Sequence, residues 1–268
     1  MQNKLELHQL IKVFGSNPAE AVRLLEQGHS KNEVQEATGL NVGLAGVSAT
    51  FKKGEISCVM GLSGSGKSTL IRHINRLIDP TKGEVRLDGE NILHYSLDQL
   101  RQVRRQKMSM VFQGFALLPH LNVLHNVALG LKVRHETKAT QEQLAKEWVD
   151  KVGLAGYEHH YPDELSGGMR QRVGLARALA TDSEILLMDE AFSALDPLIK
   201  QEMQDQLIAL QQKLNKTIVF VTHDIDEALK LGQHIVILRD GRVEQAGTPL
   251  EIQHSPVNDY VAHFLPKL

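Results

Sequence analysis

The chain has 268 residues, a formal net charge of −2 at pH 7, and 42% hydrophobic residues. This length suffices for one large domain, or a domain with a subdomain, around a sizeable core. The near-neutral charge, without a long block of one sign, gives no electrostatic support to nucleic-acid binding. The apolar runs are strand-sized and too short to span a bilayer, and the N-terminal residues do not resemble a signal peptide.

The first predicted element is a strand over residues 4–13, and two helix signals follow it. Asn17 is predicted to cap a short helix that has Pro18 in its first turn. Ser30 and Glu33 match a capping box at the start of a second one. The sequence therefore predicts a helical insert over residues 16–41 in an otherwise β-rich opening.

The predicted secondary structure of the remaining chain falls into a strand, a mostly helical region and a region of alternating helices and strands. A buried strand over residues 55–60 holds Cys58, the one cysteine, which has no partner for an internal disulfide. Residues 92–161 are mostly helical in pattern. Over residues 162–268 helices alternate with short β-branched strands, which favours a mostly parallel sheet covered by helices. The last residues have the spacing of a short helix packed on the body of the protein.

A glycine-rich run, GLSGSGKST, follows the strand over residues 55–60 and opens a predicted helix. Glycines let consecutive backbone N–H groups turn toward one anion, and the helix N-terminus adds its dipole. Lys67 would supply charge to the β- and γ-phosphates, and Ser68 a hydroxyl to Mg²⁺. The alternative is a plain glycine-rich turn, but the strand before and the helix after favour phosphate binding. The candidate residues are Gly61, Leu62, Ser63, Gly64, Ser65, Gly66, Lys67, Ser68 and Thr69.

Two carboxylates end the apolar run ILLMDE over residues 185–190. A buried strand that ends in acids places Asp189 where it can hold Mg²⁺, directly or through water. Glu190 can then polarise an attacking water, while positioning and charge neutralisation do most of the catalysis. A strand with a solvated acidic end is the alternative interpretation.

The run LSGGM over residues 165–169 predicts a second phosphate site, because Ser166 and a glycine pair precede a helical pattern. One nucleotide does not need two such sites from one chain. Two chains that face each other head to tail would use both.

With these three motifs, the sequence resembles the ATP-binding cassette (ABC) ATPases over nearly its whole length. GLSGSGKST resembles the Walker A motif, ILLMDE the Walker B motif and LSGGM the signature motif. Gln113 matches the Q-loop, Asp196 in SALD the D-loop, and His223 the H-loop. Met169 stands where the family often has Gln. The resemblance implies one α/β cassette domain over residues 1–268, with a mostly parallel core sheet, an antiparallel β subdomain and an inserted α-helical subdomain.

The resemblance also implies roles for individual residues in ATP binding and Mg²⁺-dependent hydrolysis. Gln113 would contact Mg²⁺ or its water and relay the nucleotide state to a membrane subunit. His223 would contact the γ-phosphate and orient Glu190 and the water. Phe14 resembles the aromatic that stacks on adenine, although it could be an ordinary core residue. The residues that would serve the nucleotide of a second chain are Ser166, Gly167, Gly168, Met169 and Asp196.

Within the family, the sequence looks like the importer branch for glycine betaine, proline and choline, whose relatives also carry histidine or carnitine. That likeness implies a homodimer on the cytoplasmic face of the inner or plasma membrane, with a transmembrane permease and, indirectly, a substrate-binding protein as partners. The chain runs to Leu268 without room for a CBS module, so we expect no steep activation by salt. The alternatives are a soluble non-transport ABC ATPase and a small-molecule P-loop kinase.

Overall fold

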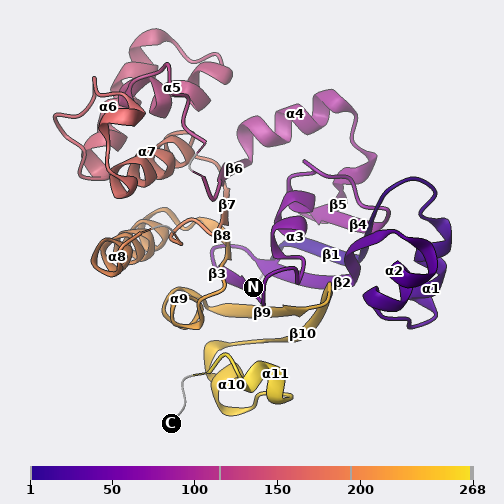
Figure 1. The fold of residues 1–268 in the computed structure, drawn as a ribbon. Coiled ribbons are helices and arrows are strands. Elements are labelled where there is room, and N and C mark those ends of the chain that lie inside the picture. The colour runs from indigo at the N-terminus through magenta and orange to yellow at the C-terminus, as the bar shows by residue number, and fades with distance from the viewer. Residues whose placement is uncertain (1, 115, 194, 266–268) are drawn as a thin grey trace. The chain divides into compact units, whose positions relative to one another are not determined.

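The structure is a computed structural model that describes residues 2–114, 116–193 and 195–265. The chain forms two compact units, each coloured by residue number in Figure 1. The first consists of Met1–Ser96 and Val219–Leu268, and the second of Leu97–Ile218. The prediction of a single cassette domain over residues 1–268 stays a prediction.

Two sheets build the first unit. One is antiparallel, with the strand order β2-β1-β4-β5; its strands are β1 (Asn3–Phe14), β2 (Asn41–Lys52), β4 (Lys82–Leu87) and β5 (Glu90–Asn91). In the other, β10, β9, β3 and β8 are successive neighbours, with β3 parallel to β9; these are β3 (Ile56–Met60), β8 (Thr217–Val221), β9 (His234–Arg239) and β10 (Arg242–Gly247). Every residue of β3 and β8 is buried, as expected for strands covered on both faces.

The predicted helical insert is present as α1 (Ala19–Glu26) and α2 (Lys31–Thr38), which lie beside β1 and β2 in Figure 1. The capping box of Ser30 and Glu33 is confirmed, with both of its hydrogen bonds made. The cap predicted at Asn17 is wrong: Asn17 has φ +56°, Pro18 occupies the N-cap position, and no side chain caps α1. The helices share a hydrophobic core with the strands, formed by Ile11, Val13, Ala21, Leu25, Val34, Val42 and Ala45.

The other helices of the first unit have eight residues or fewer, and two of them form the C-terminal segment. They are α3 (Lys67–Ile74), the 3₁₀ helix η1 (Ile92–His94), α9 (Ile225–Leu231), α10 (Pro249–His254) and α11 (Asp259–Ala262). The predicted packing of the C-terminal helix is confirmed, because Val261 of α11 is fully buried.

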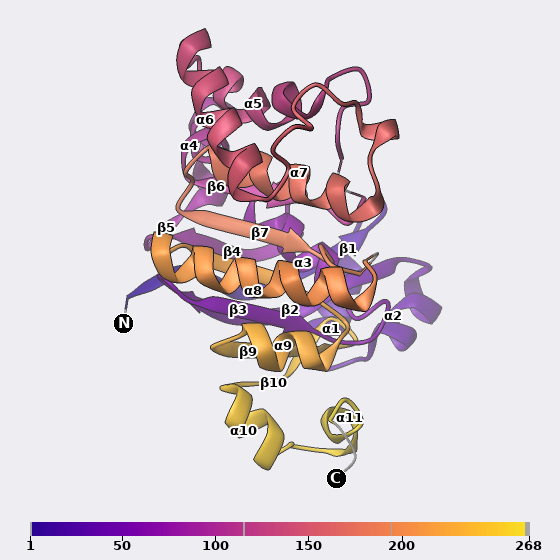
Figure 2. The same ribbon diagram turned by 90° about the vertical axis from the view of Figure 1, so that its left-hand side faces the viewer.

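In the second unit, β6 (Met108–Val111) and β7 (Ile185–Asp189) pair in parallel. Three helices pack against one another, as Figure 2 shows: α5 (Val123–Val133), α6 (Lys138–Lys151) and α7 (Gly167–Ala180). The unit also holds α4 (Leu97–Gln106), the 3₁₀ helix η2 (Pro162–Glu164) and α8 (Pro197–Leu214). The helical pattern over residues 92–161 is thus confirmed in the main, but sequence reasoning missed the four-residue strand β6.

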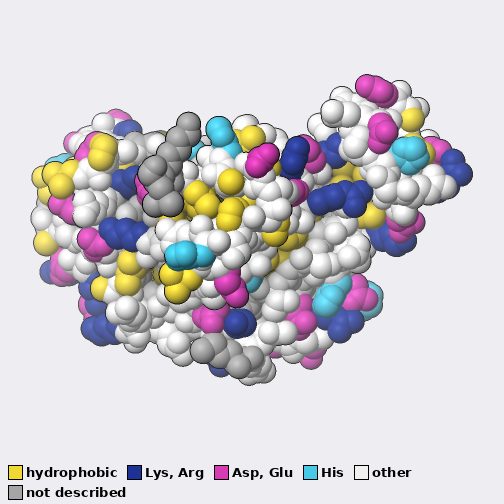
Figure 3. Space-filling model, turned by 90° about the horizontal axis from the view of Figure 1, so that it is seen from below, with side chains coloured by type: hydrophobic (Ala, Val, Ile, Leu, Met, Phe, Trp, Pro, Cys, Tyr) yellow, Lys and Arg dark blue, Asp and Glu magenta, His cyan; other side chains and the backbone are white. Residues whose placement is uncertain are grey.

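Charged side chains of both signs are intermixed on the face drawn in Figure 3, in line with the near-neutral net charge. Across the residues that the structure describes, no helix combines the length and apolar composition that crossing a bilayer requires. The described residues also contain no group of three or more His, Cys, Asp or Glu side chains arranged to hold a metal ion.

Candidate nucleotide site

The glycine-rich loop leaves β3 and enters α3 through three residues in the left-handed region. Gly61, Gly64 and Gly66 have φ values of +147°, +78° and +106°, which side chains other than hydrogen rarely permit. Space is also restricted at Gly61 and Gly66. A Cβ would lie 2.3 Å from the carbonyl oxygen of Leu238 at Gly61 and 2.7 Å from that of Gly43 at Gly66, whereas a Cβ on Gly64 would meet nothing within 4 Å. Neighbouring backbone therefore packs closely against the two ends of the loop, and the loop is exposed at Gly64.

The polar groups of this loop fit a phosphate. Lys67 is 6% exposed, and its Nζ donates to the carbonyl oxygens of Gly61 (2.8 Å) and Leu62 (3.1 Å). The buried hydroxyl of Ser65 has no hydrogen-bond partner in the described part of the chain, which is costly unless a ligand or water completes it. No side chain caps the start of α3 at Gly66, so the N–H groups of its first turn can serve an anion.

His223 lies at the same edge of the sheet as the loop. The N–H of Thr222, which follows β8, donates to the carbonyl oxygen of Val59 in β3 at 3.1 Å. The chain therefore leaves β8 beside the strand that feeds the loop. His223 is the next residue and is exposed, and Asp224 then caps α9 by accepting from the N–H groups of Asp226 and Glu227.

Phe14 is the last residue of β1, and its side chain is 40% exposed. A Cβ on Gly43 would lie 2.8 Å from Cε2 of Phe14 and 3.1 Å from Cγ2 of Thr69. The ring therefore rests against the glycine backbone, next to the first turn of α3, while part of its surface faces solvent. This is a platform on which a base can stack, and it argues against an ordinary core position.

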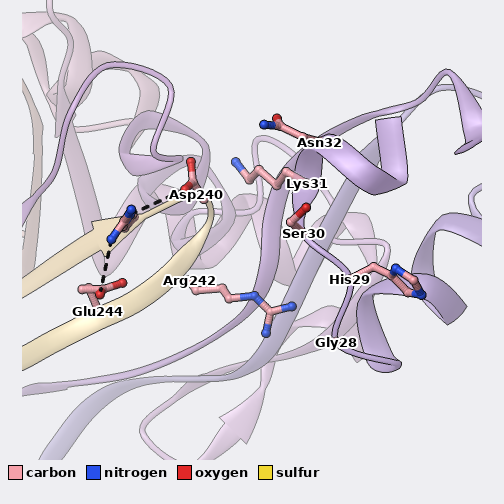
Figure 4. Close-up of a pocket in the computed structure, with 9 residues that line it drawn as sticks. Gly28, His29, Ser30, Lys31, Asn32, Asp240, Arg242 and Glu244 are labelled. Carbon is pink, nitrogen blue, oxygen red and sulfur yellow. Dashed lines mark ion pairs between the residues drawn. The ribbon is translucent and has the colours of Figure 1, made fainter. Parts of the chain in front are cut away.

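Lys31 supports the Gly43 backbone on which the Phe14 ring rests, a contact that sequence reasoning missed. It lines a pocket of about 310 Å³ beside the insert. Figure 4 shows it between the α1–α2 turn and the β9–β10 hairpin. The Nζ of Lys31 donates to the carbonyl oxygen of Gly43 at 3.1 Å, and burial lowers the pKa of Lys31 while Asp240 offsets part of that shift. Because lysines at helix starts are usually solvated, no sequence signal pointed to this contact. The pocket is lined by Gly28, His29, Ser30, Lys31, Asn32, Arg239, Asp240, Arg242 and Glu244.

In the second unit, the carboxyl ends of two parallel strands bring Gln113 and Glu190 together. Gln113 lies in the loop after β6, and its Nε2 donates to Oε2 of Glu190 at 2.9 Å. Glu190 directly follows β7 and adopts φ +46°, a conformation that costs energy in a residue with a side chain and that clusters at functional sites. Asp189, the last residue of β7, is 1% exposed.

The signature residues form a second recess in the same unit. Ser166 caps α7, its hydroxyl accepting from the N–H of Met169 at 3.3 Å. Asp196 caps α8 by accepting from the N–H of Ile199 at 3.1 Å. Both helix starts face one pocket of about 290 Å³, which brings all five predicted signature and D-loop residues together. Its lining consists of Ser166, Gly167, Gly168, Met169, Arg172, Leu195, Asp196 and Ile199.

The predicted residues thus form three groups. The first unit holds the glycine-rich loop, Phe14 and His223; the second holds Gln113, Asp189 and Glu190 at strand ends and, separately, the signature pocket. Ala194 of SALD and Phe115 after Gln113 lie outside the described residues.

The comparison with known families decides the affiliation. The profile described as "ABC transporter" matches residues 44–193, which include the glycine-rich loop, Gln113, the signature run and Glu190.

The chain belongs to the ABC transporter family.

Curated relatives of this ABC chain are similar over almost its whole length. It is 54% identical to the glycine betaine/proline betaine transport system ATP-binding protein ProV of Escherichia coli K12, over 98% of this chain and 66% of that protein. It is 48% identical to the trimethylamine N-oxide transport system ATP-binding protein TmoW of Ruegeria pomeroyi, over 96% of this chain and 75% of that protein. The chain therefore spans slightly less than two thirds of the length of ProV.

Among solved structures, the ABC fold is matched by the ATP-binding cassette MJ0796. A dimeric post-hydrolysis state of MJ0796 bound to ADP and Pi gives a TM-score of 0.78 at 33% identity, covering 91% of this chain and 98% of that one. This confirms the predicted α/β cassette fold, with its parallel strands, antiparallel sheet and helices.

Proposed function

We propose that this chain is the ATP-hydrolysing, nucleotide-binding subunit of an importer for small molecules whose cationic nitrogen carries at least two alkyl groups beyond the carbon skeleton and no N–H bond, as in quaternary ammonium compounds and trimethylamine N-oxide. One observation carries the proposal. Over 98% of its length the chain is 52–54% identical to four ATP-binding proteins named for the transport of glycine betaine, proline betaine or carnitine. The names of other relatives add choline and trimethylamine N-oxide. None of these molecules carries an N–H bond on that nitrogen, and this shared chemistry defines the proposed substrate class.

ATP binding is assigned to the first unit. The triphosphate lies against the N–H groups at the start of α3, where Lys67 exchanges the carbonyl oxygens of Gly61 and Leu62 for phosphate oxygens. A charge-assisted hydrogen bond to phosphate is stronger than one to a neutral carbonyl. The adenine stacks on the exposed part of Phe14. Both groups belong to one unit, so a single compact body supplies phosphate and base recognition.

Hydrolysis needs a base and a divalent cation. Glu190 is the group that accepts a proton from the attacking water, and the amide of Gln113 orients its carboxylate by a hydrogen bond. Ser68 of the first unit carries a hydroxyl, and Gln113 and Asp189 of the second carry an amide oxygen and a carboxylate. Each is an oxygen donor of a kind that suits Mg²⁺. When bound, Mg²⁺ neutralises charge on the phosphates. We assign His223 to the γ-phosphate, because it follows a strand that ends beside the glycine-rich loop.

A second copy of the chain is the proposed partner for the signature pocket. In that pocket the capped start of α7 presents Ser166 and the glycine pair around a recess large enough for a phosphate group. The dimeric state of MJ0796, at 33% identity, supports a dimer here. The transport-system names of the relatives support a permease, and we infer a substrate-binding protein and a position on the cytoplasmic face of the membrane on the same ground.

The test is uptake through a reconstituted transporter that contains this chain, its permease and its binding protein. Uptake of labelled glycine betaine, choline and trimethylamine N-oxide is compared with that of histidine, which carries N–H groups. We expect ATP-dependent uptake of the alkylated compounds that is lost with Glu190→Gln. ATP hydrolysis without a co-purifying membrane protein would favour the non-transport ABC ATPase, and phosphoryl transfer to an acceptor would favour a kinase.

A further inference from the structure

The C-terminal segment contacts the glycine-rich loop through the hydroxyl of Tyr260, in α11. This hydroxyl accepts a hydrogen bond from the backbone N–H of Leu62 at 3.3 Å and donates one to the carbonyl oxygen of Leu238, in β9, at 2.9 Å. A residue 198 positions away in sequence is thereby tied to the second residue of the loop.

The ring of Tyr260 is itself held in place. The guanidinium of Arg239 lies 4.8 Å from the ring centroid, a distance typical of a cation–π contact. Arg239 pairs in turn with Asp240 (3.8 Å) and Glu244 (3.9 Å), the two acids labelled in Figure 4. Phe264 meets the Tyr260 ring edge to face at 5.3 Å. Burial raises the pKa of Tyr260, so its hydroxyl keeps its proton at neutral pH and can donate to Leu238.

The carbonyl group of Leu62 contacts Lys67, the lysine proposed to bind phosphate. The carbonyl oxygen of Leu62 accepts from Nζ of Lys67 at 3.1 Å. The same carbonyl also accepts from the backbone N–H of Ser65 at 3.1 Å, whereas the N–H of Leu62 donates to Tyr260. Its side chain is 52% exposed and offers the loop little anchorage by packing. The backbone of Leu62 is held mainly by hydrogen bonds. Lys67 and Ser65 belong to the loop itself, and among the described residues the hydrogen bond from outside the loop comes from Tyr260 of α11.

We propose that Tyr260 is a positioning residue for nucleotide binding, which fixes the backbone of Leu62 and so keeps the glycine-rich loop and Lys67 ready for the triphosphate. The inference rests on the proposed function, since it concerns the affinity of the same site for ATP. A loop that is ordered before binding loses less conformational entropy when the ligand arrives. Tyr260 contacts Leu62, Leu238, Arg239 and Phe264, and none of these is assigned to the chemical step. We therefore expect Tyr260 to act on the binding step.

The test uses Tyr260→Phe, which removes the hydroxyl and keeps the ring under Arg239. The matched control is Tyr157→Phe, because the structure gives the Tyr157 hydroxyl no hydrogen-bond partner among the described residues, and its ring is 40% exposed. Arg239→Gln is a second variant, which removes the cation–π contact with the Tyr260 ring but keeps the hydroxyl. For each protein we would measure the Kd for ATP, the KM and kcat of hydrolysis, and hydrogen exchange at the Leu62 amide without nucleotide.

We expect Tyr260→Phe to raise the Kd and KM for ATP about two- to ten-fold, as the loss of the hydrogen bond to the loop at Leu62 implies, with kcat unchanged. Exchange at the Leu62 amide should accelerate by a similar factor. Arg239→Gln should give a smaller shift in the same direction, and Tyr157→Phe none. An unchanged Kd, or a fall in kcat alone, would overturn the inference. If the wild-type chain itself binds no ATP, the proposed function fails instead, and that result is recognised before any variant is compared.

Discussion

Replacement of Phe14 by alanine is expected to weaken ATP binding through the base alone. The ring rests against Gly43, and Nζ of Lys12 lies 5.2 Å from its centroid. Because the side chain is still 40% exposed, adenine can stack on part of the ring once the Lys12 side chain moves aside. Stacking of a base on an aromatic side chain contributes about 1–3 kcal/mol. Because the contact with Lys12 is given up when the base stacks, we take the lower part of this range, about 1–2 kcal/mol, which corresponds to a roughly five- to thirty-fold higher Kd.

The assay compares ATP with inorganic tripolyphosphate, which carries the phosphates but no base. Phe14→Ala should weaken ATP binding by that factor and leave tripolyphosphate binding unchanged, and Phe14→Tyr should restore ATP binding. Gly43→Ala provides an independent variant, because its Cβ would lie 2.8 Å from the Phe14 ring and displace it. Equal ATP affinity in Phe14→Ala and wild type, with the melting temperature lowered, would refute stacking and return Phe14 to a packing role.

Three further predictions concern the catalytic groups and the core. Lys67→Ala should weaken ATP binding roughly ten- to hundred-fold by removing a charge-assisted hydrogen bond, whereas Glu190→Gln should bind ATP normally and hydrolyse it at least about a hundred-fold more slowly; near-normal turnover by Glu190→Gln would exclude it as the base. A mixture of Lys67→Ala and Ser166→Arg chains should recover activity that neither has alone, because the heterodimer keeps one intact composite site; no recovery despite proven heterodimers would contradict the head-to-tail arrangement. The thiol of Cys58 should resist iodoacetamide at neutral pH until the protein unfolds, because complete burial and the nearby Glu227 raise its pKa; rapid alkylation of the folded chain would show that β3 is not buried as described.

Local signals predicted local structure well. The capping box of Ser30 and Glu33 involves atoms three residues apart, so the sequence alone contains what determines it. The prediction of a cap at Asn17 was wrong because Pro18 itself takes the N-cap position, while Asn17 adopts a left-handed conformation with φ +56°. The strand β6 was missed because four residues are too few to show a period.

Residue spacing could not predict contacts between residues that are far apart in the sequence. The hydrogen bond from Gln113 to Glu190 joins residues 77 positions apart, and that from Leu62 to Tyr260 joins residues 198 apart. The motifs placed Gln113 and Glu190 in one site through family resemblance. Tyr260 belongs to no such motif, so only the three-dimensional arrangement of α11 and the loop shows its contact.

The shared core of the insert has a consequence for how such a segment could be removed. Leu25 of α1 and Val34 of α2 pack in the same cluster as Ile11, Val13 and Val42 of the host strands. Deleting the two helices would leave those strand residues facing water, at a cost of about 1.5–3 kcal/mol for each large side chain exposed. A minimal cassette for engineering must therefore retain the two helices.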